Sequence, residues 1–274
     1  MITRFDHVVI GVQKLEEALE SYTKLGFEVF EGGRHPSLGT RNAIIRFGLD
    51  YIELLEIEHE EIARKNGAFG CELADFLSFR SGLIGFVLAT DNIDHEANQM
   101  QNSEIKHSGP FDMDRKKPDG ATVAWKLVIP GASPWRKPWP FLIQWQTSDE
   151  KRQELEKKGT HSNGCETVLG IDLLVENLAE SRLFYEDGLG LQPHVSNKER
   201  TALYQIGEFY LNVKEPSNEA EKLEIENLGS GPYRLVLGAK PTTRSSHYAK
   251  DDINVAFFEF DHTLTQGARI VRII

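Results

Sequence analysis

Apolar and polar positions follow one another in blocks along the first 30 residues. The segment Phe5–Tyr22 (FDHVVIGVQKLEEALESY) begins with an apolar run, continues with a short polar link and ends in a helical pattern. Apolar residues recur there at the i, i+3, i+4, i+7 spacing of one helix face, at Leu15, Ala18, Leu19 and Tyr22. Gly26 is the predicted C-terminal cap of this helix, and Phe27–Phe30 begins a further strand.

The same order of elements returns twice. Segment Leu169–Tyr185 (LGIDLLVENLAESRLFY) repeats it closely, and Leu189-Gly190-Leu191 then matches Leu25-Gly26-Phe27. A fainter copy begins at Leu83 (LIGFVLATDNIDHEANQM), where Ile93 stands in the place of Leu15. A strand, a link and an amphipathic helix that recur three times, each followed by strand-like segments, indicate an internal duplication.

Candidate strands follow each helix. They are Phe27–Phe30, Arg41–Phe47 and Asp50–Glu56 in the first unit; Ser108–Phe111, Ala121–Ile129 and Phe141–Trp145 in the second; and Gln192–His194, Thr201–Ile206 and Glu208–Val213 in the third. The end of the chain is interpreted as a degenerate fourth unit, with strands at Tyr233–Leu237, Val255–Phe260 and Arg269–Ile273 but no clear helix.

Two charged stretches interrupt these units. Glu58–Phe79 is an insertion with a broken helical pattern, and Asp149–Lys158 (DEKRQELEKK) is interpreted as a solvated helix that links the halves. We therefore predict a first domain over residues 1–158 and a second, degenerate domain over residues 159–274.

Composition narrows the class of protein. The 274 residues are 40% hydrophobic and 27% charged, as in a soluble protein with a real core, and the formal net charge of −11 argues against nucleic acid or an anionic membrane surface as partner. No apolar run approaches the roughly 20 residues that span a bilayer, and the N-terminus has no signal-peptide pattern. Cys71 and Cys165 lie far apart and are expected to be free thiols, so a cytoplasmic location is expected.

The first and second units carry a family resemblance. The runs FDHVVIGVQKLEEALESYTKLGFEV and GGRHPSLGTRNAIIRFGLDYIELLEI resemble the first βαβββ module of the vicinal-oxygen-chelate superfamily, in its glyoxalase-like subgroup. The resemblance covers residues 4–57, 82–147 and, more weakly, 168–214. It implies an α+β fold in which repeated βαβββ modules form open, curved mixed sheets around a site. Open sheets have edges to protect, so a homodimer is compatible with this fold.

The resemblance also implies where ligands stand, because such modules typically supply one from the first strand and one from the last. In the first module these positions fall on His7 and Glu53. In the second they fall on Gly85, which has no side chain to offer, and on Gln144. The third module has Gly170 and Asn212 there, so the second half keeps the architecture but has lost the ligand types.

Imidazole and carboxylate are ligands of zinc, iron, manganese and nickel, so His7 and Glu53 are candidate metal ligands and catalytic residues. Strand alternation predicts that His7 faces the same way as Phe5 and Val9, and Glu53 the same way as Tyr51 and Leu55. Two strong ligands and an amide from Gln144 make a poor metal site. A third donor would come from His35, from His107 or from a partner chain, and otherwise the site holds no metal.

Several further residues suit the binding of a small molecule. All four tryptophans, Trp125, Trp135, Trp139 and Trp145, lie in the second module, where aromatic side chains form either a pocket lining or core. Arg115 and Arg34 are candidates for binding a carboxylate or enolate oxygen. His35 in the GGRHPSLGT loop, Asn42 at the entry to a strand, and Gln144 are further candidate substrate-binding residues.

Two classes of function remain open. In the first, a metal at His7 and Glu53, with Gln144 as a weaker donor, chelates vicinal oxygens of a small carbonyl substrate, and the protein is a lyase, an isomerase or a dioxygenase. In the second, the cavity binds or sequesters a small molecule without a metal, as bleomycin-resistance proteins of the superfamily do. Three or more converging His or Glu donors favour the enzyme, and a lone His7–Glu53 hydrogen bond favours binding.

Overall fold

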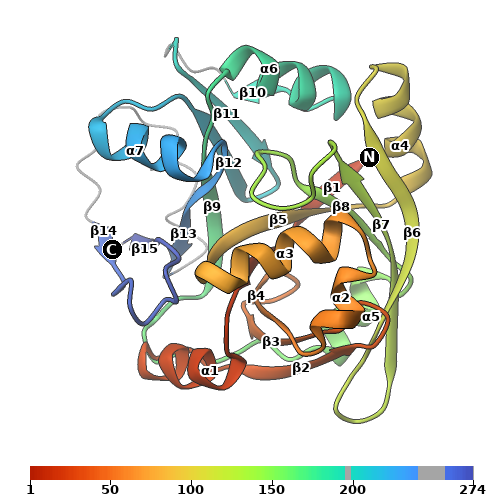
Figure 1. The fold of residues 1–274 in the computed structure, drawn as a ribbon, viewed down its shortest axis with the longest axis vertical. Coiled ribbons are helices and arrows are strands. Elements are labelled where there is room, and N and C mark those ends of the chain that lie inside the picture. Colours follow the sequence, from red (N-terminus) through yellow and green to blue (C-terminus); the bar gives the residue numbers. More distant parts are fainter. Residues whose placement is uncertain (195–198, 240–256, 274) are drawn as a thin grey trace.

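The computed structural model describes residues 1–194, 199–239 and 257–273. It is a mixed α+β protein with two sheets, one of which curls into a closed barrel. The barrel half contains β1 (Ile2–Gly11), α1 (Leu15–Lys24), β2 (Phe30–His35), β3 (Thr40–Arg46), β4 (Tyr51–Ile57), α2 (Glu60–Arg64), α3 (Ala68–Phe79), β5 (Gly82–Thr90), α4 (Ile93–Asn102), β6 (His107–Lys116), β7 (Thr122–Pro130), β8 (Phe141–Trp145) and α5 (Asp149–Leu155). Figure 1 shows α2 and α3 lying across the barrel.

The second half forms an open sheet. It contains β9 (Thr167–Leu174), α6 (Leu178–Arg182), the π-helix η1 (Leu183–Gly188), β10 (Pro193–His194), β11 (Thr201–Ile206), β12 (Phe209–Lys214), α7 (Glu219–Leu228), β13 (Gly231–Gly238), β14 (Phe257–Glu259) and β15 (Ile270–Ile273). No helix among the described residues is long and apolar enough to cross a membrane.

The two sheets have corresponding strand orders. The barrel runs β1-β4-β3-β2-β6-β7-β8-β5, and the second sheet runs β10-β11-β12-β9-β13-β15-β14. In both, a central antiparallel pair (β1–β5, β9–β13) is flanked by parallel partners, β4 and β8 in the barrel and β12 and β15 in the second sheet. The expected fold of repeated modules is confirmed, with one difference. The first sheet closes, through a pairing of Arg34 on β2 with Lys116 on β6.

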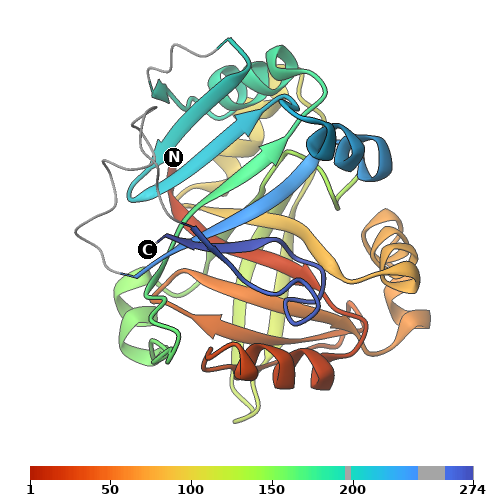
Figure 2. The same cartoon turned by 90° about the vertical axis from the view of Figure 1, so that its left-hand side faces the viewer.

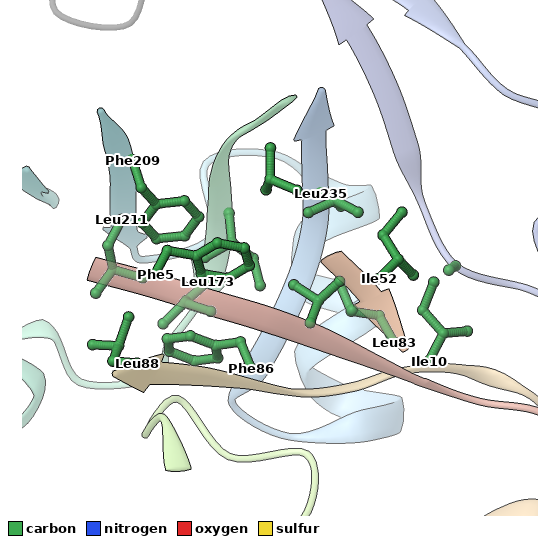
Figure 3. Packing of buried hydrophobic residues seen from close by; sticks show 14 of the residues in the cluster. Phe5, Ile10, Ile52, Leu83, Phe86, Leu88, Leu173, Phe209, Leu211 and Leu235 are labelled. Atoms are coloured by element: carbon green, nitrogen blue, oxygen red, sulfur yellow. The ribbon is translucent and has the colours of Figure 1, made fainter. Parts of the chain in front are cut away.

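The core lies between the barrel wall and the second sheet. The outward side chains of β1 and β5 pack against β9, β12 and β13, and Phe5 stacks on Phe209 with ring centroids 4.2 Å apart (Figure 3). Figure 2 shows the second sheet lying alongside these barrel strands. Strand β1 is therefore covered on both faces, which explains why every residue from Phe5 to Gly11 is buried.

A β-bulge in β1 corrects one expectation about side-chain direction. The register against β5 shifts between Phe5 and His7, so Asp6 is an extra residue on β1. Phe5 consequently points outward into the core, whereas His7 and Val9 point into the barrel. The predicted common face of Phe5 and His7 is thus wrong. That of Tyr51, Glu53 and Leu55 is confirmed, since all three face the barrel interior.

Other elements also differ from the pattern-based expectation. Residues 27–29 are not a strand, because the backbone N–H of Phe27 bonds the carbonyl of Tyr22 and closes helix α1. Helix α7 was not predicted, because its sequence is charged and only Glu221 is buried. The strand expected at Val255–Phe260 is observed from Phe257, its first two residues lying outside the described residues.

Helix α5 occupies the predicted charged linker but is not wholly solvated. Arg152 is only 2% exposed and lies over the ring of Trp145, with the guanidinium carbon 3.9 Å from the ring centroid. Its guanidinium is 3.1 Å from Glu156 and 3.5 Å from Asp6. Arg152 of this linker is therefore a buried cation that packs against the barrel wall.

Candidate functional site

The interior of the barrel holds a cavity of about 70 Å³. Its wall is mainly aromatic and aliphatic, and includes Trp125, Trp135, Trp145 and Phe141. Ionisable side chains also face it, among them His7, Glu53, His35 and Arg115. The volume corresponds to about five water-sized spheres, which suits a small ligand.

His7 and Glu53 lie together on this surface. The Nε2 atom of His7 is 3.5 Å from Oε2 of Glu53, and the amide of Asn42 donates a hydrogen bond to the other oxygen of Glu53. The ring of His7 stacks on Tyr51 with centroids 4.4 Å apart. These contacts fix the imidazole plane and leave Nε2 directed at the cavity side of β4.

Asp6 completes this arrangement, although sequence reasoning did not single it out. The bulge lets neighbouring residues meet, so Oδ1 of Asp6 lies 2.7 Å from Nδ1 of His7. Its other oxygen accepts a hydrogen bond from Nε1 of Trp145 at 2.8 Å and lies 2.8 Å from Arg4. The available signal was an acid inside an apolar strand, because a buried carboxylate requires partners.

The electrostatics of the site favour a charged pair. Burial by itself lowers the pKa of His7, but its hydrogen bonds to Asp6 and Glu53 outweigh burial and raise it. Burial raises the pKa of Glu53, but His7 and Asn42 outweigh it and bring the pKa to about 2. Burial lowers the pKa of His35 to about 4, so this ring is neutral near pH 7.

Arg115 is a buried cation without a counter-ion in the described part of the chain. The residue is 5% exposed, its Nε has no hydrogen-bond partner, and no carboxylate of the described residues lies within ion-pair distance. It sits on β6 beside the pairing that closes the barrel. An unpaired buried guanidinium is costly, and an anionic ligand would relieve that cost.

The remaining candidate residues divide into two groups. His35 lines the cavity, and its Nδ1 lies 3.0 Å from Oγ1 of Thr40. Arg34 lies outside the cavity and pairs with Glu58 at 2.9 Å. Trp139 packs against Phe184 in the core between the halves.

The expected role of Gln144 as a ligand at the site is wrong. Its Oε1 accepts a hydrogen bond from the backbone N–H of Ile93, and its Nε2 donates to the carbonyl of Asp91, both at 2.9 Å. It therefore holds the start of α4 and faces away from the cavity. The parallel register explains the error: Val9 pairs with Glu53 as Val87 pairs with Phe141, so the last-strand position of the second module is Phe141.

The donor set does not fit a resident metal ion. At the two ligand positions the first module offers His7 and Glu53, and the second offers Gly85 and Phe141, neither of which can ligate through its side chain. His35 also faces the cavity, but it does not join His7 and Glu53 in a group that could hold a metal. Among the residues described, no group of three or more His, Cys, Asp or Glu side chains could hold a metal. Zinc and iron sites use at least three protein donors.

Comparison with known proteins supports the fold. A model of the glyoxalase-like domain family matches residues 5–189. The crystal structure of a hypothetical protein from Staphylococcus aureus superposes with a TM-score of 0.72 at 18% identity, over 99% of each chain. No curated protein matches the chain.

Two further solved structures are more distant. A variant of 4-hydroxymandelate synthase from Streptomyces coelicolor gives a TM-score of 0.56 at 11% identity, over 96% of this chain and 78% of that one. A fusion of a xylose isomerase-like TIM barrel with 4-hydroxyphenylpyruvate dioxygenase gives 0.54 at 14% identity; all of this chain is covered, but only 49% of that one. At such identities the likeness concerns the fold alone.

Proposed function

The chain belongs to the glyoxalase-like domain family of the vicinal-oxygen-chelate superfamily, and within it we propose that this protein binds a small carboxylate without a metal. Arg115 carries the proposal. It is a cation inside an aromatic cavity, and it lacks a counter-ion among the described residues. The carboxylate of the ligand would accept hydrogen bonds from the guanidinium of Arg115, while the tryptophan and phenylalanine rings would enclose the apolar part of the ligand.

The size of the cavity limits the ligand. About five water-sized spheres fit, so the bound acid has only a few non-hydrogen atoms unless the wall moves. Leu38, Phe69, Met113 and Leu127 line both this cavity and a larger hollow of about 390 Å³. These four side chains form the partition through which we expect the ligand to pass.

Calorimetry with simple acids tests the proposal. Propionate and butyrate are the probes, and propionamide and butyramide are the matched neutral compounds. We expect the acids to bind and the amides not to bind. Arg115→Met should weaken acid binding at least tenfold, since a charged hydrogen bond contributes about 1.5–3 kcal/mol.

A control variant makes this test specific. Arg34→Met removes an arginine of β2 that is paired with Glu58. This arginine lies outside the cavity, so acid binding should be unchanged. Equal binding of acids and amides, or equal binding to the wild type and Arg115→Met, would refute the proposal. Stoichiometric metal in protein purified without chelator, lost in both His7→Ala and Glu53→Ala, would refute metal independence.

A second candidate function follows from Asp6, His7 and Glu53. Asp6 fixes Nδ1 of His7, which directs the protonated Nε2 toward the cavity. This arrangement suits proton transfer beside a carbonyl: the carboxylate of Glu53 would accept a proton from carbon, and the imidazolium would hydrogen-bond the enolate oxygen. The probe is 2-oxobutyrate in D₂O, with exchange at carbon 3 followed by NMR.

The exchange experiment separates catalysis from binding. A catalyst should exchange protons faster than buffer, and Glu53→Gln should abolish exchange while 2-oxobutyrate still binds through Arg115. Binding of 2-oxobutyrate without exchange in the wild type would contradict the second candidate and leave the carboxylate-binding proposal intact.

A further inference from the structure

A second hollow lies where the two halves of the molecule meet. It has a volume of about 190 Å³ and receives side chains from both halves. From the barrel half come Arg80, which follows α3, and Arg136 of the β7–β8 loop. From the second half come Glu224 of α7 and His262 and Arg269, which lie between β14 and β15.

The hollow is cationic in a protein whose net charge is −11. Three guanidinium groups line it, and Glu224 is the single carboxylate in the lining that the structure describes. Glu259, near the rim, lies 3.4 Å from Arg269 and 2.9 Å from His262. Even with Glu259 counted, the arginines leave an excess of positive charge.

Arg136 is held in place by backbone groups of both halves. Its guanidinium donates to the carbonyl of Leu83 at 3.1 Å and to that of Pro232, and its backbone N–H bonds the carbonyl of Ile84 at 2.8 Å. A β-carbon on Gly231 would stand 2.8 Å from the carbonyl oxygen of Arg136, so the second half packs directly on this residue.

In this position the guanidinium of Arg136 has N–H groups that are not used in hydrogen bonds. The Nε of Arg136 is buried without a partner in the described chain, and its Nη2 is 3.7 Å from Glu224, beyond hydrogen-bond distance. The backbone of Arg136 has φ of 53°, a left-handed conformation that is uncommon for arginine and that clusters at ligand-binding positions. Burial lowers the pKa of Arg136 to about 10, although Glu224 opposes this shift and Arg80 adds to it.

Arg80 also has no ion pair within the residues that the structure describes. It is exposed at the mouth of the hollow and rests against Phe76, 5.9 Å from the ring centroid. Arg269 stacks on Tyr233 at 4.6 Å, which keeps its guanidinium on the opposite wall. Guanidinium groups on separate elements thus face one space.

We propose that this hollow binds a phosphate dianion, free or as a monoester, with Arg80, Arg136 and Arg269 as its donors. Arginine forks match the oxygens of phosphate, and a phosphate group has more oxygens than a carboxylate to share among guanidinium groups on separate elements. The space exceeds that needed for one phosphate group, which leaves room for a small esterified alcohol. Because α3, β5, α7 and β13 all border it, the bound anion joins the two halves.

The test uses inorganic phosphate and glycerol 1-phosphate as probes, in calorimetry and thermal unfolding at constant ionic strength with chloride as reference. Both probes should bind and raise Tm more than chloride does. Arg80→Gln should weaken phosphate binding about tenfold or more, since it removes a charged donor. Its side chain is exposed and has no ion pair in the described chain, so we expect the variant to fold.

Two other variants make the result specific. Glu224→Gln removes the opposing charge and should tighten phosphate binding several-fold. Arg200→Gln, an exposed arginine paired with Glu215 elsewhere in the second half, should leave binding unchanged. Tighter binding of glycerol 1-phosphate than of phosphate would assign the hollow to a monoester, and equal binding would assign it to free phosphate. Phosphate indistinguishable from chloride, unaltered binding in Arg80→Gln, or weaker binding in Glu224→Gln would overturn the proposal.

Discussion

The barrel and the second sheet place different residues at equivalent points of one module. In the barrel, His7 pairs in register with Tyr51, and Val9 pairs with Glu53. In the second sheet, Gly170 pairs with Tyr210, and Asp172 pairs with Asn212. Gly170 therefore corresponds to His7, and Asn212 to Glu53.

Even the irregularities of the strands correspond. Two of the three register shifts between β1 and β5 are bulges at Asp6 on β1 and Ile84 on β5. The second sheet has them at Leu169 on β9 and Tyr233 on β13, which are the matching positions. The bulge therefore belongs to the module, and only in the barrel does it bring an acid beside a histidine.

The polar groups are also used differently. In the second sheet, Arg234 lies at the position of Gly85 and approaches Asp172 to 2.5 Å, while Asn212 donates to the same carboxylate at 3.0 Å. In the barrel, Arg115 faces a cavity without such a partner in the described chain. Similar backbones thus hold an ion pair in the second sheet and an arginine without a counter-ion in the barrel. Of the two, only the barrel arginine would gain from binding an anionic ligand.

The largest expected difference concerns the two buried acids. Asp6→Ala leaves His7, Arg4 and Arg152 without their shared carboxylate and should lower the free energy of unfolding by about 3–5 kcal/mol. Asp172→Ala should cost less, about 1–3 kcal/mol, because the side chain of Arg234 is 29% exposed and can be solvated. Urea denaturation of both variants measures the difference.

Asp6→Asn removes the charge of the carboxylate and keeps the shape of the side chain. The amide keeps an acceptor for Trp145 but loses the charge, so its stability should lie between those of the wild type and Asp6→Ala. Equal losses of unfolding free energy in Asp6→Ala and Asp172→Ala would show that the two acids contribute equally to stability. That result would contradict the difference described between the two sheets.

A smaller difference is expected at two glycines that lack the family's ligand side chain. In Gly170→Ala, the new β-carbon would stand 2.4 Å from the backbone oxygen of Tyr210, which should cost about 1–3 kcal/mol. In Gly85→Ala, its nearest neighbours are Phe141 and Trp135 at 3.5 Å, an ordinary contact, so the change should stay within about 0.5 kcal/mol.

Thermal unfolding of both alanine variants checks this expectation. A Gly85→Ala variant as unstable as Gly170→Ala would mean that the cavity wall beside Trp135 is as tightly packed as the second sheet. In that case the barrel would not have room for a ligand beside β5.

Sequence reasoning predicted the parts of the site that depend on local pattern. The repeat of strand, link and helix predicted the modules, and the alternation in β4 placed Glu53 on the inner face with Tyr51. The inward direction of His7 was also expected, although through a common face with Phe5 that the bulge removes. Asp6 could not be assigned a role, because the bulge depends on pairing with β5.

Other residues depended on register and on distant packing. Gln144 was misplaced because the second module's last strand pairs so that Phe141 takes the position of Glu53. Arg152 lies on a helix whose sequence is typical of a solvated linker, and only its packing on Trp145 shows otherwise. Neither the register of a strand nor the burial of one arginine has a signal within its own segment.

The smallest expected effect distinguishes the charged pair of the barrel from its neutral counterpart, Asn212. The folded-state pKa of Glu53 lies below its ordinary value of 4.5, so its contribution is present above pH 4.5 and is lost as the pH falls toward 2. The pKa of His7 lies above its ordinary value of 6.5, so its contribution is full below pH 6.5 and is lost as the pH rises through the raised pKa.

Both groups therefore contribute fully between about pH 4.5 and pH 6.5. In that window, wild type should exceed Glu53→Gln in free energy of unfolding by on the order of 1 kcal/mol, and the excess should shrink on both sides. Urea titrations from pH 3 to pH 9 measure it. The exposed Glu154→Gln on α5 should show no such maximum, because Lys151 is the one partner of that carboxylate among the described residues and the pair lies at the surface. A Glu53→Gln difference that stays constant with pH would mean that His7 and Glu53 do not share a charge interaction, and the barrel would then differ from the second sheet in shape alone.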